Sequence, residues 1–417
     1  MQSINLMAPA GSWESLQSAV KAGANSVYFG INQFNMRANT STSFDISDLD
    51  QISALCKKNK IQSYLVLNTL VYDDEISDLE KICRQAKKAK LNAVIASDWA
   101  AIQAARKHDL EVHISTQANI SNLKAVKFFA EYCNVIILAR ELSLEQIASI
   151  CSEIKKQNIR GPGGDLIKIE VFIHGALCVS ISGKCYMSLA LYNQSANRGS
   201  CIQPCRRSYT VTDDQTGEQL RINNKYIMSP RDLCTIGMID KLIQAGISVL
   251  KIEGRGRAAD YVYKVTKAYR EAVDSVKNGT YTKEKIKKWT ESFKSVYNRN
   301  FWQGGYYLGH KMSEWAASYG SQSSLKKLYV GKVTNYFGKS QIGEFLIEDN
   351  EIKIEDMIMV TGTTTGYAET VVKSLFKDDK PVTTATKGSI VTIPFSEKIR
   401  RNDKIYVFKK RFEPFTP

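Results

Sequence analysis

An alternation of strand-like and helix-like segments, repeated about eight times within the first 270 or so residues, constrains the fold most strongly. Short β-branched and apolar runs are typical of buried parallel strands. Between them, apolar residues recur every three or four positions, as in amphipathic helices. The predicted strands span residues 4–8, 26–30, 62–68, 93–97, 111–115, 135–139, 167–173 and 248–252. This order predicts a closed TIM-like (β/α)8 barrel, with an open doubly wound sheet as the alternative.

The barrel hypothesis also predicts where function should concentrate. In such barrels the carboxyl ends of the strands meet at one face, which carries the active site. Polar residues that follow the predicted strands are Asn68, Gln117, Asn119, Arg140, His174, Glu253 and Arg255. We therefore expect these side chains to surround the barrel mouth.

The pattern divides the chain into three parts. Residues 1–275 form the predicted barrel domain, interrupted after the seventh strand by a cysteine-rich insertion at 175–227. Long loops of this kind in compact domains are usually functional or disordered. Residues 276–325 read as a basic helical connector. Residues 326–417 contain short alternating strands separated by Gly, Asn and Asp turns, which predict a small all-β domain, either a barrel or a sandwich.

The insertion holds the most unusual chemistry of the chain. It contains Cys178, Cys185, Cys201 and Cys205, whereas the other five cysteines are spread singly, mostly in helix-like apolar stripes. No secretory signal and no run of roughly 18 to 20 apolar residues is present, so we expect a cytoplasmic protein with reduced thiols and no membrane partner. The spacing lacks the paired Cys-x-x-Cys knuckles of many zinc sites. Zinc and iron-sulfur remain equally favoured, and unrelated buried thiols are the third possibility.

The charge of the chain indicates an anionic partner. Its formal net charge is +15, and residues 264–300 and 398–411 contribute most of the excess. Clustered Lys and Arg side chains attract nucleic acid phosphates, so RNA or DNA is a candidate partner. The alternative is that these residues form ordinary solvated faces.

Several other side chains are candidates for chemistry. His174 ends the seventh strand, and Glu170, four residues earlier, should share its face. Lys251 and Glu253 should likewise share a face of the eighth strand, either as a structural pair or in substrate binding. Arg198 and Arg206, beside the cysteines, suit thiolates, carboxylates or phosphates. His-Glu-x-x-His and Gly-x-Ser-x-Gly protease motifs are absent, and a Cys178–His174 dyad is conceivable but crowded by other thiols.

The cysteine region also resembles a known family. The runs EVFIHGALCVSISGKCYMS, ANRGSCIQPCRRSY, MSPRDLC and LKIEGR resemble the signature of the peptidase U-32 family. The opening APAG and the segment NRNFWQGGYYLG fit as well, so the likeness covers about residues 5–310. In length and pattern the chain looks most like the tRNA 5-hydroxyuridine synthase branch.

This resemblance implies an oxygen-independent hydroxylase with a four-iron four-sulfur cluster, using prephenate as hydroxyl donor for the wobble uridine of tRNA. Carried over to this chain, it implies Cys178, Cys185, Cys201 and Cys205 as ligands, with Cys234 as a possible replacement for Cys205. Catalytic or orienting roles then fall to His174, Glu170 and Glu253. Substrate binding falls to Asn68, Gln117, Arg198, Arg206, Arg231, Lys251 and Arg255. The alternatives are a collagenase-like peptidase and a non-catalytic RNA-binding subunit, and a paralogous protein partner is possible.

Overall fold

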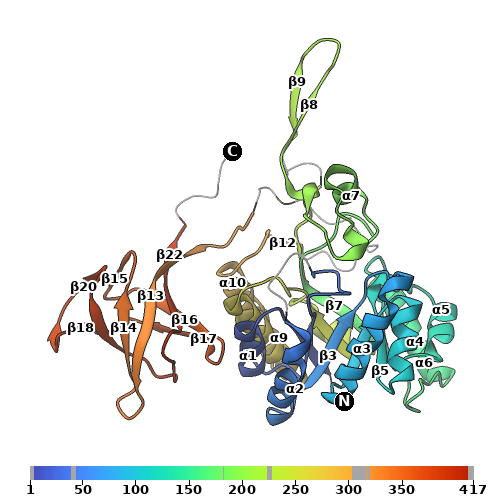
Figure 1. Ribbon diagram of the computed structural model, residues 1–417, viewed down its shortest axis with the longest axis horizontal. Helices are drawn as coiled ribbons and strands as arrows, with labels where there is room; N and C mark the ends of the chain where they lie inside the picture. Colours follow the sequence, from blue (N-terminus) through green and yellow to red (C-terminus); the bar gives the residue numbers. More distant parts are fainter. Residues whose placement is uncertain are drawn as a thin grey trace.

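The chain folds around a closed barrel of eight parallel strands (Figure 1). The computed structural model describes residues 4–38, 44–181, 183–222, 228–302, 316 and 320–411. The barrel strands are β1 (Asn5–Ala10), β2 (Ser26–Phe29), β3 (Gln62–Leu67), β4 (Ala93–Ala96), β5 (Glu111–Ile114), β6 (Val135–Ile137), β7 (Lys168–Gly175) and β11 (Val249–Ile252). Strand β11 closes the ring because it pairs in parallel with both β1 and β7. The predicted TIM-like fold is confirmed, and the open sheet is excluded.

Helices surround the strand ring in the expected alternation. They are α1 (Trp13–Lys21), α2 (Leu49–Lys58), α3 (Ile76–Lys88), α4 (Trp99–Lys107), α5 (Leu123–Ala130), α6 (Leu144–Lys156), α8 (Ile239–Gln244) and α9 (Ala259–Lys277). Short 3-10 turns lie at Ile46–Asp48, Asp73–Glu75 and Thr116–Ala118. Ser12, Asp98, Asn122 and Ser143 accept hydrogen bonds from backbone N–H groups in the first turns that follow them. Such N-caps satisfy donors that a helix start leaves unpaired, so they help to define where these helices begin.

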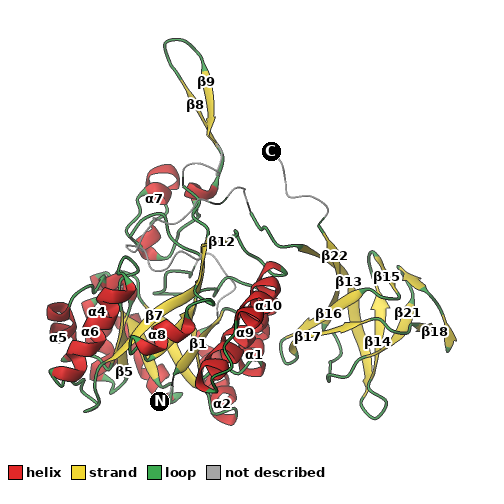
Figure 2. Cartoon of the chain, turned by 180° about the vertical axis from the view of Figure 1, so that it is seen from behind, coloured by secondary structure: helices red, strands yellow, loops and turns green. Residues whose placement is uncertain are grey.

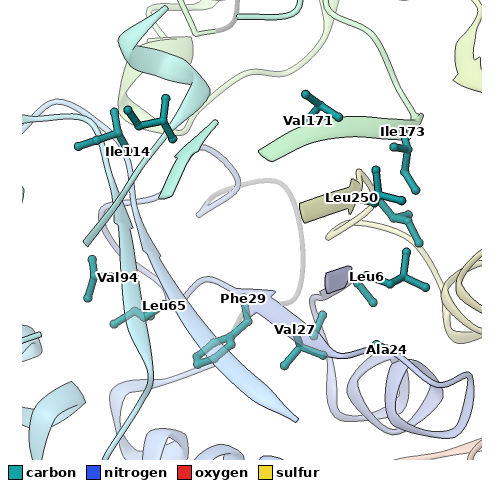
Figure 3. Close-up of a cluster of buried hydrophobic side chains, with 14 of the residues drawn as sticks. Leu6, Ala24, Val27, Phe29, Leu65, Val94, Ile114, Val171, Ile173 and Leu250 are labelled. Carbon is teal, nitrogen blue, oxygen red and sulfur yellow. The ribbon is translucent and has the colours of Figure 1, made fainter. Parts of the chain in front are cut away.

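Strand alternation produces two apolar layers. Val27 and Phe29 of β2 belong to the layer between strands and helices, part of which Figure 3 shows. Tyr28, between them in sequence, belongs to a separate cluster inside the barrel. Because successive side chains of a strand point to opposite faces, one run of residues supplies both layers.

The isolated cysteines lie in the outer layer. Cys56, Cys83, Cys133 and Cys151 are buried there, as predicted for small hydrophobic side chains. Burial raises the pKa of Cys56, Cys83 and Cys133 to about 12 and that of Cys151 to about 11. These thiols are therefore protonated and unsuited to nucleophilic chemistry at neutral pH.

The cysteine-rich insertion stands above the barrel mouth, with a projecting hairpin (Figure 2). It contains α7 (Met187–Tyr192), 3-10 turns at Ala196–Arg198 and Pro204–Arg206, and the hairpin strands β8 (Tyr209–Thr212) and β9 (Gln219–Ile222). The chain then forms β10 (Asp232–Cys234), which pairs antiparallel with β7 and parallel with β12 (Phe301–Trp302). Residues 232–234 therefore extend the sheet, and α8 begins only at Ile239.

A β-bulge interrupts β7 near its carboxyl end. Phe172 pairs with Lys251 of β11, but the next pair joins His174 to Ile252, so Ile173 is the extra residue. An extra residue reverses the side-chain alternation beyond it. Phe172 therefore faces the barrel interior, whereas Ile173 and His174 both face the helix layer.

The carboxyl-terminal part forms a separate antiparallel β-domain, as predicted. Its eight-stranded sheet consists of β13 (Leu325–Phe337), β14 (Ile342–Ile347), β16 (Met357–Gly362), β17 (Gly366–Val371), β18 (Phe376–Lys377), β19 (Lys380–Pro381), β21 (Ile390–Pro394) and β22 (Lys404–Lys410). A small two-stranded sheet joins β15 (Glu351–Lys353) to β20 (Thr384–Thr386). This domain has its own apolar core.

The β-domain packs against the barrel helices. Tyr367 and Phe408 are buried together with Ala259 of α9. The Lys21 ammonium at the end of α1 donates to the Tyr367 carbonyl, and Lys327 pairs with buried Asp260 at 2.8 Å. Helix α10 (Lys283–Lys294) packs on α9. No helix in the described part of the chain is long and apolar enough to span a bilayer.

Gly175 at the end of β7 should be intolerant of a side chain. Its φ is +107°, and an added Cβ would lie 2.4 Å from the Glu253 carbonyl oxygen. Gly217 at the hairpin tip has φ +72° but no atom within 4 Å of such a Cβ. We expect Gly175→Ala to cost roughly 1–3 kcal/mol from backbone strain, plus the clash, and to lower the thermal unfolding midpoint more than Gly217→Ala. Circular dichroism would measure both midpoints, and equal midpoints would contradict the close-approach argument.

Candidate functional site

The mouth of the barrel holds a cavity of about 150 Å³. Barrel strands supply its floor, including Tyr28, Phe172 and Lys251. Loops that follow the strands supply its walls, including Asn68 and Gln117. The cysteine-rich insertion contributes the remaining lining. The cavity therefore lies at the face where TIM barrels carry their active sites.

All four clustered cysteines line this cavity. Cys178 is exposed, and Cys185, Cys201 and Cys205 are partly buried. Burial raises the pKa of Cys205 to about 11, with neighbouring Arg206 opposing and the other three thiols adding to the rise. The four thiols are therefore close enough for their proximity to disfavour the Cys205 thiolate.

The thiols suit a soft metal centre in donor chemistry and in location. In the described residues, however, no three His, Cys, Asp or Glu side chains converge closely enough to hold a metal ion. The described geometry is thus open, with the donors around one cavity rather than in a closed coordination shell. Cys234 is 3% exposed within the outer apolar layer, where burial raises its pKa to about 12. It is not among the described cavity-lining residues.

A buried ion pair lies at the cavity floor. The Lys251 ammonium is 2.7 Å from Glu170 Oε1, and the two side chains are 5% and 0% exposed. Lys251 and Glu253 both line the cavity, as the predicted alternation requires. The predicted Lys251–Glu253 structural pair is not what forms, because Lys251 bonds to the neighbouring strand instead.

Glu253 belongs to a second charged group on the cavity wall. Arg37 donates to Glu253 Oε1 at 3.1 Å, and the Tyr28 hydroxyl donates to Oε2 at 3.2 Å. Burial alone would raise the pKa of Glu253, but Arg37, Arg140 and Arg255 together lower it to about 2. The carboxylate is consequently ionised at neutral pH and serves as an acceptor.

Other polar residues of the cavity lining are hydrogen-bonded to side chains of neighbouring loops. Arg255 donates to Asn35 Oδ1 at 2.8 Å, and Asn68 donates to Ser115 Oγ at 3.1 Å. Gln117 Oε1 is buried without a hydrogen-bond partner among the described residues. A buried carbonyl oxygen of this kind is costly unless a ligand or water satisfies it.

Two arginines flank the cavity on other sides. Arg140 stacks on Phe172, with its guanidinium carbon 4.0 Å from the ring centroid, and donates to the Ala176 carbonyl at 3.3 Å. Arg206 is buried and donates to the Leu177 carbonyl and to Ser229 Oγ. Burial and the nearby charge of Arg299 lower the pKa of Arg206 to about 10. Arg206 therefore remains cationic at neutral pH.

His174 lies away from the cavity, so its predicted shared face with Glu170 is wrong. The β7 bulge turns the imidazole into the helix layer among Tyr261, Tyr269, Phe293 and Phe301, and Nδ1 is 3.2 Å from the Tyr269 hydroxyl. Burial, with a smaller effect of Arg257, lowers its pKa to about 3. His174 is therefore a neutral side chain of the packed outer layer, and it is not brought to Cys178.

Two predicted substrate-binding arginines also lie outside the described cavity lining. Arg198 stacks on Tyr72 and pairs with Glu75, so it fastens the insertion to the loop after β3. Arg231 lies just before β10. Conversely, Arg37 lines the cavity, although the sequence offered no periodic signal for it. Arg140 had a signal, its position directly after a strand.

The cavity as a whole favours anions. Arg37, Arg140, Arg206, Lys251 and Arg255 line it, whereas the nearby carboxylates are Glu253 on the wall and Glu170 beneath. Such a cationic excess in a partly enclosed space binds negatively charged groups, and the thiols add soft donors.

Comparison with known proteins identifies the family. The profile of peptidase family U32 matches residues 11–317. A protein named collagenase from Porphyromonas gingivalis is 48% identical over 408 residues, covering 98% of each chain. An uncharacterized protease from Methanocaldococcus jannaschii is 36% identical and covers 98% of this chain and 99% of its own. A tRNA hydroxylation protein from Bacillus subtilis is 32% identical and covers 71% of this chain and 69% of its own.

The names of these relatives can be compared with the family branch that the sequence motifs predicted. The more similar relatives carry protease names, which favours the peptidase alternative over the tRNA hydroxylase branch suggested by the motifs. The family assignment is common to both. This chain belongs to peptidase family U32.

Proposed function

We propose that this protein is an iron-sulfur-dependent RNA hydroxylase that forms 5-hydroxyuridine at the wobble position of tRNA, with prephenate as hydroxyl donor. The observation that carries the proposal is the meeting of four thiols and five cationic side chains around one cavity at the barrel mouth. Thiolates suit iron-sulfur clusters, and cations suit carboxylates and phosphates. The likeness to a tRNA hydroxylation protein supports the same class of reaction.

In this proposal Cys178, Cys185, Cys201 and Cys205 hold the cluster. When bound, a four-iron four-sulfur cluster supplies one-electron chemistry at the cavity. The surrounding arginines offset the negative charge of a thiolate-bound centre. Cys234 takes no part, because it lies in the outer apolar layer.

The other lining residues bind and orient the substrates. Arg140 and Arg255 line the cavity from the loops that follow β6 and β11, and together they suit a small dicarboxylate. Glu253, held ionised, accepts hydrogen bonds and holds Arg37 in place rather than donating a proton. Asn68 and Gln117 suit the polar edge of an extruded base, which enzymes of this kind read by hydrogen bonds.

Basic helix and strand surfaces would hold the rest of the RNA. Lys283, Lys287 and Lys288 are exposed on α10, and Lys404 and Lys410 are exposed on β22. These residues belong to the two basic regions of the sequence. Exposed cations of this kind bind phosphates without reading the sequence of bases.

Replacement of any cluster ligand should remove iron. We expect Cys178→Ser, Cys185→Ser, Cys201→Ser and Cys205→Ser each to lower iron content from about four per chain and to weaken the visible thiolate-to-iron absorption. Cys151→Ser is the matched control, since that thiol is buried on α6 away from the cavity. Iron analysis and absorption spectra of anaerobically purified protein would measure this. A colourless protein with stoichiometric zinc, or serine variants with full iron, would refute the ligand assignment.

Deletion of the gene should remove the product nucleoside. Nucleoside mass spectrometry of tRNA and ribosomal RNA should show loss of 5-hydroxyuridine derivatives, restored by the wild-type chain and by Cys151→Ser but not by Cys205→Ser. An unchanged nucleoside profile would refute RNA hydroxylation. If the purified protein still bound tRNA with a steep salt dependence, that outcome would favour a non-catalytic RNA-binding subunit.

A peptidase is the second candidate, because the 48% identical relative is named a collagenase. The structure does not join Cys178 to His174, so a nucleophile in this cavity would need a different base. If the chain is a peptidase acting through Cys178, the purified protein should cleave gelatin. Cys178→Ala should then abolish cleavage without loss of iron. Absence of cleavage by the fully loaded wild-type protein would remove this candidate.

A further inference from the structure

Lys251 occupies an unusual position for a lysine. Its side chain is almost fully buried at the cavity floor, where Glu170 holds the ammonium at 2.7 Å. The ammonium also lies 4.3 Å from the Tyr28 ring centroid and 5.4 Å from that of Phe172. Two aromatic faces and one carboxylate therefore surround this nitrogen, which opens toward the cavity.

A carboxylate-binding group lies beside it. Arg140 stacks on the same Phe172 ring, so that this ring contacts both cations. Arg140 Nε is buried without a hydrogen-bond partner among the described residues, and the carboxylate on which the charge of this guanidinium acts is Glu253. Because Arg140 and Lys251 line the same cavity, a ligand can offer a carboxylate to Arg140 and its adjoining carbon to Lys251.

Glu170 is placed to receive a proton. Its Oε1 bonds Lys251, and its Oε2 is buried without a hydrogen-bond partner in the described residues. Burial lowers the pKa of Lys251, although Glu170 opposes this shift. Burial thus favours the neutral amine, the form in which lysines act as nucleophiles.

We propose that Lys251 forms an imine with 2-oxo acids bound in the cavity. The ammonium gives a proton to Glu170, and the freed amine attacks the ketone carbon to form a carbinolamine. The carbinolamine hydroxyl then leaves as water with the proton returned by Glu170, and a C=N bond replaces the C=O bond. No oxidant or reductant is required. Arg140 holds the ligand carboxylate and thereby selects 2-oxo acids over simple ketones.

The inference reaches beyond RNA hydroxylation. Prephenate carries a 2-oxo acid group, so its attachment to Lys251 rests on the proposed function. Imine formation with a simple 2-oxo acid does not rest on it. The reaction can therefore be tested without RNA and without a metal centre.

Reductive trapping with pyruvate tests the proposal. The full chain is incubated with pyruvate and sodium cyanoborohydride, and intact mass spectrometry is followed by peptide mapping. We expect one reduced pyruvate adduct per chain, located at Lys251. Acetone, which lacks a carboxylate, and lactate, which lacks the ketone, should leave Lys251 unmodified. Arg140→Gln should raise the pyruvate concentration for half-maximal trapping by about tenfold, since it removes a charge-assisted contact.

Two variants distinguish a loss of imine formation from a loss of folding. Lys251→Arg keeps the cation beside Glu170 but cannot form the imine, so the adduct should be lost while the thermal midpoint changes little. Lys264→Met removes a partly buried lysine that pairs with Glu369 outside the cavity, and trapping should persist. Adducts spread over surface lysines, or an equal yield in Lys251→Arg, would overturn the proposal, as would no adduct at saturating pyruvate. An adduct without any RNA product would refute only the hydroxylase proposal.

Discussion

The closure of the barrel depends on β11, which lies between the first and seventh strands of the ring. Across this seam Lys251 reaches Glu170 on β7. Two isolated charges in this interior would each cost several kcal/mol, and removal of one partner from a buried pair typically costs about 3–5 kcal/mol. The ion pair therefore favours the pairing of β11 with β7 in addition to their backbone hydrogen bonds. The same pair forms the floor of the cavity, so the closure of the fold and the composition of the site share these residues.

The β7 bulge determines which β7 side chains face the cavity. By inserting Ile173, it keeps Phe172 inside the barrel and turns His174 outward. Beyond the bulge, Leu233 and Cys234 of β10 pair with Gly175 and His174. The chain thus leaves β7 and returns to the edge of the same strand, with both ends of the insertion anchored at the mouth. This anchoring explains how four cysteines within a segment of 28 residues come to line one cavity.

Local periodicity was sufficient to predict the strands, because each barrel strand is specified by its own apolar run. The cysteines could be placed at the mouth because they directly follow the seventh strand. Periodicity failed where one residue changed the alternation, which separated His174 from Glu170. It also failed for Arg198, whose partner Glu75 lies 123 residues earlier. Arg37 could not be predicted from periodicity, since a side chain that reaches Glu253 from the loop after β2 follows no regular spacing.

The charges of the cavity distinguish the two candidate functions more sharply than the fold does. A cysteine hydrolase needs a base that titrates near neutral pH. Here the pKa of Glu253 is held at about 2, and that of His174 at about 3 outside the cavity. The pKa of Cys205 is about 11, so its thiol is protonated in the metal-free protein at neutral pH. A bound cation readily displaces such a proton, because metal coordination deprotonates thiols outright. If a metal binds here as proposed, the cationic walls would stabilise the resulting anionic centre, whereas neither Glu253 nor His174 would supply a base for hydrolysis.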